Sequence, residues 1–348
     1  MLVAMKEERL AGVLVGTAVG DALGLPFEGM SRRRVRRQLA GGALRHRFLF
    51  GRGMVSDDTE QACLVARALL KSRAEPDRFA SELGRDLRWW LLRAPAGIGW
   101  ATLRGIVRLW LGFAPSRSGV RSAGNGPAMR APLLGVFAAE DEPRLRELVR
   151  ASTLITHTDP RAFDGALAVA LAAAMASRCS TPELNGALVL REISFRLQPG
   201  PMAELVRRAS DWVDRPAQGL ADDLGAGAGV SGFVNQTVPL ALLCWARNPG
   251  NAPAALTEVV ALGGDTATTA AIVGALCGAS AGEACFPPAW VCGIAEWPCN
   301  VAWMKELSRC LSLGSAPAPL PWLALLLRNV VFTFGVLVLV LRRALPPY

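Results

Sequence analysis

Several residue types and motifs that mark common protein classes are scarce or missing in this sequence. It has one tyrosine and two histidines among 348 residues, and its eight cysteines form no C-x-x-C pair. The missing pair argues against a zinc knuckle or a thioredoxin-like motif, because both need closely spaced thiols. Reduced, buried thiols in a cytosolic protein are the simplest account of the cysteines. Alternation of β-branched and polar residues is also scarce, so we expect an all-α body.

The first residues lack a long apolar run, and we expect no signal peptide. Met1 to Met5 is followed at once by Lys6, Glu7, Glu8 and Arg9, which leaves no apolar core of the required length. Acidic residues are outnumbered, 29 to 38, and the net charge is +9. That charge favours phosphate-bearing or anionic partners without identifying them. The densest basic run, residues 32–37, contains no aromatic residue. We interpret it as a solvated helix face and predict no specific nucleic-acid partner.

Apolar residues are abundant, at 51% of the chain, and the mean hydropathy is +0.29. They recur at helical spacing in many segments, punctuated by 35 glycines and 23 prolines. The first expected helix, about residues 7–22, places Gly12, Gly16 and Gly20 four residues apart, which allows close approach of another helix. We expect one helical domain over residues 1–313 and a Pro/Ala linker over 314–320.

The tail, residues 321–348, differs from the rest of the chain. Residues 322–341 are almost continuously apolar, broken by Arg328 and closed by Arg342 and Arg343. Twenty helical residues reach about 30 Å, enough for a bilayer core. Two interpretations stay open: a membrane anchor, in which Arg328 snorkels to the interface, and a helix docked on the body or on a membrane surface. We favour the anchor, with an anionic membrane as the partner.

The segment 263–279 gathers polar residues at the start of an apolar helix. A paired glycine precedes Asp265 and three threonines, and Ala, Ile, Val and Leu follow. Asp265 and Thr268 are three residues apart on the expected helix and share a face. Their hard oxygens suit Mg²⁺, Mn²⁺ or Ca²⁺. The alternative is a plain helix cap, which Asp and Thr commonly provide.

A second acidic group makes the metal interpretation stronger. Ser56, Asp57, Asp58 and Thr59 precede an apolar helix, and Asp57 with Glu60 has capping-box spacing. Capping does not require two adjacent carboxylates, whose repulsion is most readily offset by a cation. Two further acids, Asp21 and Glu28, flank a loop rich in Gly and Pro. They are candidates for the same site, although a cap and a solvated side chain explain them equally well.

Two more segments are candidates for ligand binding. Gly124, Asn125 and Gly126 allow a tight turn whose N–H groups can face an anion, although a plain loop before a helix has the same composition. His157 lies in a polar helix start, where a binding role and a structural role are both open. The glycine-rich loop at 225–229 lacks the strand of a dinucleotide fingerprint, so we reject that interpretation.

Taken in order, these segments resemble the ADP-ribosylglycohydrolase family over about residues 10–280. The resemblance implies a single orthogonal helical bundle with a cleft that holds two divalent cations, Mg²⁺ or Mn²⁺. It assigns the metals to Ser56, Asp57, Asp58, Asp265 and Thr268, with Glu28, Asp57 and Asp58 as catalytic residues. It assigns ADP-ribose binding to Asp21, Asn125, Gly126 and His157. The implied reaction is hydrolysis of an N- or O-glycosidic bond between ADP-ribose and a modified protein.

One position departs from the family pattern. The family's second metal motif reads Asp-Thr-Asp-Thr/Ser, whereas this chain has Asp265-Thr266-Ala267-Thr268. Asp57, Asp58 and Asp265 then supply three negative charges against the four positive charges of two divalent ions, and we expect one weakened metal site. Two hypotheses follow: a metal-dependent hydrolase of the cytoplasm, tethered to a membrane by its tail, or a degraded relative that binds ADP-ribose or serves as a membrane-tethered structural or regulatory protein.

Overall fold

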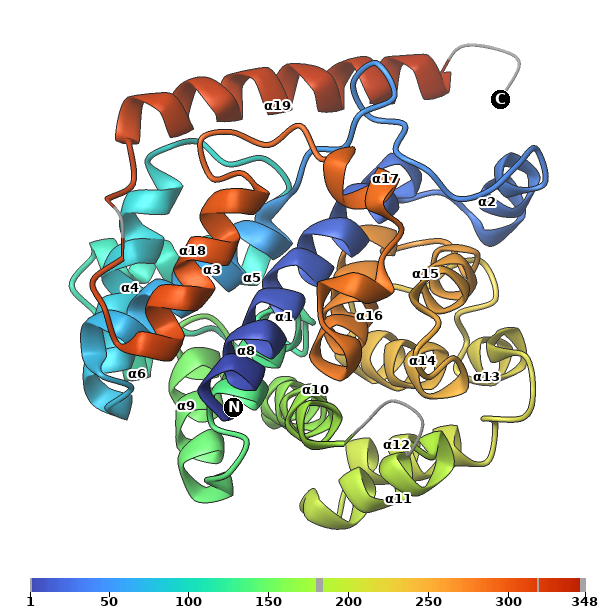
Figure 1. Cartoon of the computed structure of the whole chain (residues 1–348), viewed down its shortest axis with the longest axis horizontal. Coiled ribbons are helices and arrows are strands. Elements are labelled where there is room, and N and C mark those ends of the chain that lie inside the picture. Colours follow the sequence, from blue (N-terminus) through green and yellow to red (C-terminus); the bar gives the residue numbers. More distant parts are fainter. Residues whose placement is uncertain (1, 180–183, 318, 345–348) are drawn as a thin grey trace.

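The computed structural model describes residues 2–179, 184–317 and 319–344. Within these ranges the chain is helical, and its only β-type pairings are isolated bridges, which confirms the all-α prediction. Figure 1 shows the helices packed around a central pair, α1 and α16, with α19 lying across one end. Short 3₁₀ helices occupy Leu25–Phe27 (η1) and Glu283–Cys285 (η3). The α-helices are α1 (Leu2–Gly24), α2 (Arg32–Leu39), α3 (Asp57–Ser72), α4 (Pro76–Leu91), α5 (Trp100–Trp110), α6 (Pro115–Ser118), α7 (Gly126–Met129), α8 (Ala131–Phe137), α9 (Glu142–Leu154), α10 (Pro160–Arg178), α11 (Gly186–Arg196), α12 (Pro201–Ser210), α13 (Ala217–Asp223), α14 (Val234–Arg247), α15 (Ala252–Val260), α16 (Thr266–Ala281), α17 (Pro288–Cys292), α18 (Val301–Leu313) and α19 (Trp322–Ala344).

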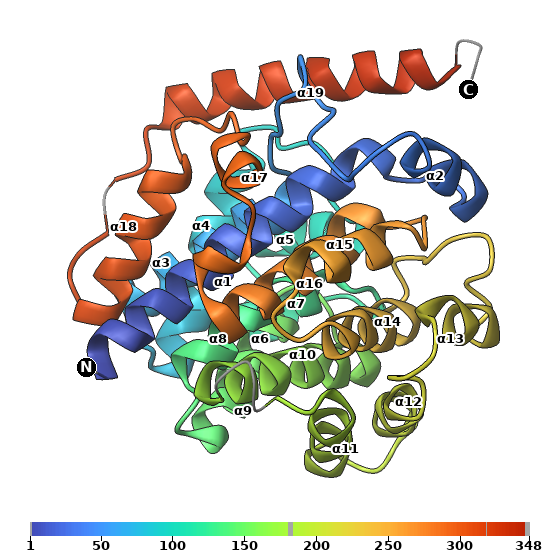
Figure 2. The ribbon, with the colours of Figure 1, turned by 45° about the vertical axis from the view of Figure 1, so that its right-hand side comes forward.

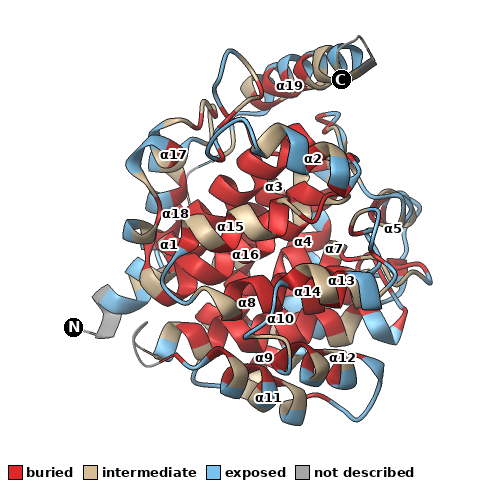
Figure 3. Ribbon diagram, turned by 90° about the vertical axis from the view of Figure 1, so that its right-hand side faces the viewer, coloured by how far each residue is buried: buried red, intermediate tan, exposed pale blue. Residues whose placement is uncertain are grey.

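The central pair is held together by glycines that let the two backbones touch. A Cβ added to Gly16 would lie 2.1 Å from the carbonyl oxygen of Gly274, and one added to Gly12 would lie 2.3 Å from that of Gly278. Gly12 faces Gly278 and the later residue Gly16 faces the earlier residue Gly274, so the two helices run antiparallel. The expected small-residue face of the first helix therefore meets α16. Figure 3 shows both helices buried, and the C-terminal end of α1 lies beside the start of α16.

The paired glycine before α16 fits a narrow passage between two loops. Gly263 and Gly264 have φ values of +71° and +81°, which L side chains rarely adopt. Gly264 exchanges backbone hydrogen bonds with residues 29 and 30 on one side, and Val230 bonds to Gly263 and Asp265 on the other. A Cβ on Gly264 would lie 2.0 Å from the carbonyl oxygen of Val230. These backbone hydrogen bonds on both sides of Gly264 fix the position at which α16 begins.

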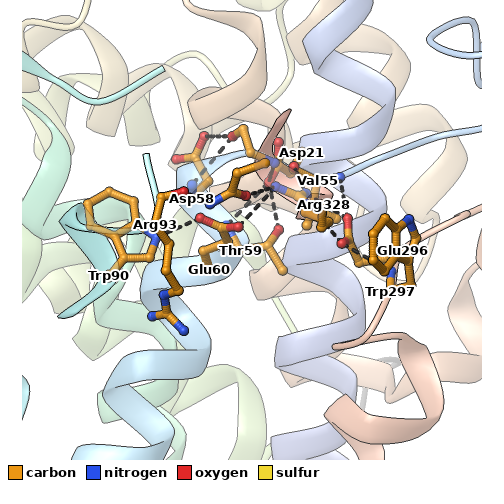
Figure 4. A network of polar contacts seen from close by, with 12 residues as sticks. Asp21, Val55, Asp58, Thr59, Glu60, Trp90, Arg93, Glu296, Trp297 and Arg328 are labelled. Carbon is orange, nitrogen blue, oxygen red and sulfur yellow. Dashed lines mark hydrogen bonds and ion pairs between the residues drawn. The ribbon is translucent and has the colours of Figure 1, made fainter. Parts of the chain in front are cut away.

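The apolar tail helix α19 packs along the body, and it does so through a buried cation. Arg328 is 1% exposed and forms ion pairs with Glu296 at 2.7 Å and Glu60 at 2.9 Å. Figure 4 shows this network, in which Arg328 also donates to the carbonyl oxygen of Val55. The partners of Arg328 are thus protein side chains. This agrees with the second interpretation of the tail, a helix docked on the body. Residues 345–348 of the predicted tail lie outside the described residues.

Length and hydropathy alone would allow two helices of the described chain to cross a bilayer. One covers Met5–Phe27 and is 94% buried, so it is the core helix of the bundle rather than a span. The other covers Trp322–Arg343, has a mean hydropathy of 2.3 and is only 28% buried. The structure therefore leaves a large apolar face on α19, even though the helix is docked by its inner side.

Gly16→Ala tests the central contact. The added methyl group would overlap the Gly274 backbone, and we expect the free energy of unfolding to fall by about 2 kcal/mol or more, despite the better helix propensity of alanine. The matched control is Gly41→Ala, because the nearest atom to its added Cβ is 3.7 Å away. The control should change stability by no more than about 0.5 kcal/mol in urea unfolding. Equal stability of the two variants would contradict the proposed role of the contact.

Candidate functional site

A cleft of about 360 Å³ opens where the end of α1 and the starts of α3, α7 and α16 meet. Figure 2 shows α1 and α16 side by side, with α7 behind them. The cleft brings together most of the residues that the sequence predicts as functional. They are Glu28, Ser56, Asp57, Asp58, Asn125, Gly126, His157, Asp265 and Thr268.

The start of α3 supplies two carboxylates and a hydroxyl. Ser56 is the N-cap, and its side chain accepts a hydrogen bond from the Asp58 amide at 3.4 Å. Asp57 accepts from Gln61 at 3.1 Å. Glu60 does not close the expected capping box. Its carboxylate instead accepts from the Trp90 indole and pairs with Arg328. Two carboxylates of this helix start, Asp57 and Asp58, therefore line the cleft, whereas the third, Glu60, contacts α19.

The start of α16 meets the start of α3 across the cleft. The Thr268 hydroxyl lies 3.3 Å from Asp58 Oδ2, and the Ser56 hydroxyl lies 3.2 Å from the same atom. Asp265 caps α16 and accepts from Asn125 Nδ2 at 2.7 Å. Two acids and two hydroxyls from segments 210 residues apart therefore converge at one point, as the sequence analysis expected. Positive helix ends on both sides favour negative charge there.

Glu28 stands beside this group, at the end of η1. Its Oε2 accepts from the Ala267 amide at 2.8 Å, which leaves Oε1 for the cleft. Burial and the charge of Asp265 raise the pKa of Glu28 to about 8. A carboxyl with this pKa is largely protonated at neutral pH when no cation is near.

Asp21 lies behind the cleft, so its expected place among the substrate-binding residues does not match its position. It is 0% exposed, and its Oδ2 accepts from Ser56 N at 2.8 Å, Thr59 Oγ1 at 2.6 Å and Thr59 N at 3.2 Å. These bonds tie the C-terminal end of α1 to the start of α3. Burial raises the pKa of Asp21 to about 6, although the hydrogen bonds from Thr59 and Ser56 oppose that rise.

The cleft gathers four acids that have no direct ion-pair partner among the described residues: Glu28, Asp57, Asp58 and Asp265. The charge of Arg130 acts on Asp57 and that of Arg343 acts on Glu28, but neither guanidinium forms an ion pair with these carboxylates. Burial raises the pKa of Asp58 well above its usual value, and the charges of Asp21 and Asp57 raise it further. Burial raises the pKa of Asp57 in the same direction, as does the charge of Asp21. For Asp265, burial outweighs the hydrogen bonds from Asn125 and Thr268, and its pKa is also raised.

The donor set fits a divalent cation in part. Among the described residues, no three Asp, Glu, His or Cys side chains are grouped closely enough to hold a metal ion by themselves. Asp58 Oδ1 is nevertheless buried without a hydrogen-bond partner, while two hydroxyls point at Oδ2 of the same carboxylate. Carboxylate and hydroxyl oxygens are the ligands that Mg²⁺ and Mn²⁺ prefer. A cation here would satisfy the orphaned oxygen and lower the repulsion.

The loop at 124–126 forms the opposite wall, but two of its amides do not face a ligand as expected. Gly124 N donates to Ser122 Oγ, and Asn125 N donates to the carbonyl oxygen of Gly232. Asn125 acts through its side chain, which bridges Asp265 and Thr237. His157 packs against both glycines and lines the cleft.

His157 is neutral at physiological pH. Burial and the charge of Arg130 lower the pKa of its imidazole to about 3. Its Nδ1 lies 2.8 Å from the Thr156 hydroxyl, which also accepts from the Arg130 guanidinium. Arg130 is fully buried and bonded to Gln61, Ser152 and Thr156, so it braces helices and does not line the cleft.

Sequence reasoning missed the wall formed by residues 97–102. Gly97, Gly99, Trp100 and Thr102 line the cleft, and Trp100 is 71% exposed. The available sequence signal was a tryptophan that closely follows two glycines at the start of a helix. An exposed tryptophan at a cleft mouth offers a flat apolar surface for an aromatic ring.

Ala267 separates the cleft from the tail helix. It lines the cleft, and it also belongs to an apolar cluster with Leu25, Met54 and Phe332 of α19. Position 267, where the resemblance leads us to expect a carboxylate, therefore belongs to the same apolar cluster as Phe332 of α19. Arg343 of α19 further donates to the carbonyl oxygen of Glu28 at 2.7 Å. The tail helix thus supports two elements of the cleft wall.

Comparisons with known proteins identify the family of the chain. A family model described as ADP-ribosylglycohydrolase matches residues 3–318. An uncharacterized protein of Archaeoglobus fulgidus is 31% identical over 299 residues, which cover 83% of this chain and 92% of that protein. The ADP-ribosyl-[dinitrogen reductase] glycohydrolase of Rhodospirillum rubrum is 26% identical over 82% of this chain and 90% of its own. A solved ADP-ribosylglycohydrolase-related protein complex superimposes with a TM-score of 0.63 at 26% identity, covering 90% of this chain and 99% of that one. The chain is a member of the ADP-ribosylglycohydrolase family.

Proposed function

We propose that this chain is a Mg²⁺- or Mn²⁺-dependent hydrolase that removes ADP-ribose from a modified protein side chain by cleaving an N- or O-glycosidic bond. The observation that carries the proposal is the convergence of four carboxylates that form no direct ion pair among the described residues: Glu28, Asp57, Asp58 and Asp265. The family name and the name of the Rhodospirillum relative support the ADP-ribosyl substrate class. The acidic cleft supports the metal.

The cation would be held by Asp57, Asp58 and Asp265, with the hydroxyls of Ser56 and Thr268. When bound, it would supply Lewis-acid activation of water near neutral pH. Asp21 orients these ligands without touching substrate, because it fixes the amides of Ser56 and Thr59. Asn125 fixes Asp265 in the same way.

Glu28 acts as the general acid that protonates the leaving group. Its Oε2 is held by the Ala267 amide, so Oε1 carries the proton that is given to the leaving atom of the glycosidic bond. Without a cation, a pKa of about 8 keeps Glu28 protonated at neutral pH. A nearby cation lowers the pKa of a carboxyl, so the proposal places the cation on Asp57, Asp58 and Asp265 rather than on Glu28. His157, Gly126 and Trp100 offer the opposite wall to the ADP-ribose moiety. The neutral imidazole can exchange hydrogen bonds with it without adding charge.

A second function is favoured by one observation, the alanine at 267. Its methyl group supplies no oxygen to the cleft and belongs to the apolar cluster that contains Leu25 and Phe332. A chain with a weakened metal site would bind ADP-ribose without hydrolysing its glycosidic bond, as a structural or regulatory protein. The retained Glu28, Asp57 and Asp58 favour the hydrolase.

The hydrolase proposal predicts that Asp58→Asn abolishes release of ADP-ribose. Purified protein is incubated with ADP-ribosylated arginine, serine and nucleic-acid substrates, with and without Mg²⁺ or Mn²⁺, and free ADP-ribose is measured. We expect metal-dependent release from at least one protein-type substrate and a loss of about 100-fold or more in the variant. The control Asp211→Asn removes a half-exposed surface carboxylate and should stay within about twofold. Binding without release by the native chain would favour the second function instead.

The raised pKa of Glu28 predicts that the stability of the metal-free protein depends on pH. Its pKa is about 8 in the folded chain against a usual 4.5, so the folded state holds a proton that the unfolded state releases. The contribution of Glu28 to the free energy of unfolding is therefore fully present below pH 4.5 and is lost as the pH rises through about 8. We expect the Tm in EDTA to fall between pH 5 and pH 8, and to fall less in Glu28→Gln.

The control for this experiment is Glu306→Gln, an exposed acid on α18 whose pKa is lowered by Arg309. It should leave the slope of Tm against pH unchanged. Mn²⁺ at pH 8 should recover part of the lost stability, because the cation binds the ionised carboxylates. An identical slope for the native chain and Glu28→Gln would contradict the assignment of the proton to Glu28.

The departure at position 267 predicts unequal metal sites. Calorimetric titration with Mg²⁺ or Mn²⁺ should give one site and a second that is weak. Ala267→Asp should tighten the second site on the order of tenfold, because it adds a ligand charge. The same change places a carboxylate against Leu25 and Phe332, so the metal-free variant should be less stable. Two equally tight sites in the native chain would refute this account.

A further inference from the structure

The outer face of α19 is an apolar stripe that the described chain leaves uncovered. Its exposed residues recur at alternating spacings of four and three, and large side chains occupy every position. Phe334 is 65% exposed and Leu327 is 58% exposed. The stripe consists of Leu323, Leu327, Val330, Phe334, Leu337 and Leu341. A helix with this pattern needs an apolar partner along its whole length.

The stripe continues onto a neighbouring loop. Phe50 is fully exposed, while Phe48 of the same loop packs under α19 with its ring centroid 5.3 Å from that of Phe332. In Figures 1 and 2 this loop rises beside α19 and its tip reaches the outer side of the helix. The loop therefore adds a projecting aromatic side chain to the same face of the molecule.

The charges around this face are positive. Residues 322–344 contain no acidic residue, and α2 is joined to the end of α19 by a hydrogen bond from Arg34 to the carbonyl oxygen of Arg343. The exposed arginines on α2, on the loop and on α19 are Arg33, Arg37, Arg45, Arg52 and Arg342, whereas the exposed Arg36 donates to Gln218 of α13. An apolar stripe beside exposed arginines is the composition of helices that lie in the interface of an anionic membrane.

We infer that α19 lies in the plane of an anionic membrane surface, with its outer stripe and Phe50 among the lipid headgroups and its inner face on the protein. A second copy of the chain fits less well, because it would bring the same positive charges together and meet the projecting loop. A spanning helix would have to withdraw Arg328 from Glu60 and Glu296, which would leave two buried carboxylates without their cation.

The test is co-sedimentation of the full chain with vesicles of phosphatidylcholine alone or with added phosphatidylglycerol. We expect binding to the anionic vesicles and release at high salt. Leu327→Glu combined with Phe334→Glu should lower the bound fraction about tenfold or more. The matched control is Leu188→Glu combined with Phe195→Glu, two apolar side chains on α11 that are at least as exposed, at the opposite end of the molecule in Figure 1. The control should bind as the native chain does, and Tm measurements should show both variants folded.

Other outcomes would overturn the inference. Equal binding to neutral and anionic vesicles would remove the role of the arginines. Resistance to alkaline carbonate would indicate a spanning helix. A dimer in sedimentation equilibrium that the α19 variant abolishes, without vesicle binding by the native chain, would indicate a second copy as the occupant. None of these results depends on catalytic activity, so the inference can fail while the proposed function stands.

Discussion

The direct backbone contact between α1 and α16 is the constraint on which the rest of the structure depends. It places the end of one helix beside the beginning of the other, and Thr266 then donates to the carbonyl oxygen of Gly24 at 2.8 Å. Glu28 comes four residues after Gly24, and Asp265 comes directly before Thr266, so the contact brings an acid from each segment to the same opening. A wider spacing would separate them. The glycines thus act on the site without lining it.

Charge at the cleft is concentrated by helix ends and left without a direct ion pair among the described residues. Next to the cleft, Glu60 and Glu296 do have a cationic partner in Arg328. The same fold therefore pairs one group of acids with an arginine and leaves the neighbouring group without a direct ion pair. A group of buried acids without an ion-pair partner is a feature of cation-binding cavities.

Much of this arrangement could be predicted from the sequence. The sequence predicted a shared oxygen-rich site from two features: paired acids beside a hydroxyl, and a second acid three residues before a threonine on another helix. The resemblance to a family supplied the order of the segments. Asp21 could not be placed, because a helix-capping acid and a ligand-binding acid have the same local sequence. The role of Arg328 was ambiguous for a similar reason, since its partners Glu60 and Glu296 come from distant segments. The wall at residues 97–102 carries no motif, and only the folded chain brings it to the cleft.

The distance along the chain between α1 and α16 has a consequence for synthesis. Gly24 and Thr266 are separated by 242 residues, so α1 leaves the ribosome long before its partner exists. Until α16 has been synthesised, the small-residue face of α1 has no partner helix. The apolar helix is then part of an incompletely folded chain, and exposed apolar surface promotes aggregation. Because α3, α7 and α16 must all be present before the cleft closes, the site is among the last features to form as the polypeptide emerges.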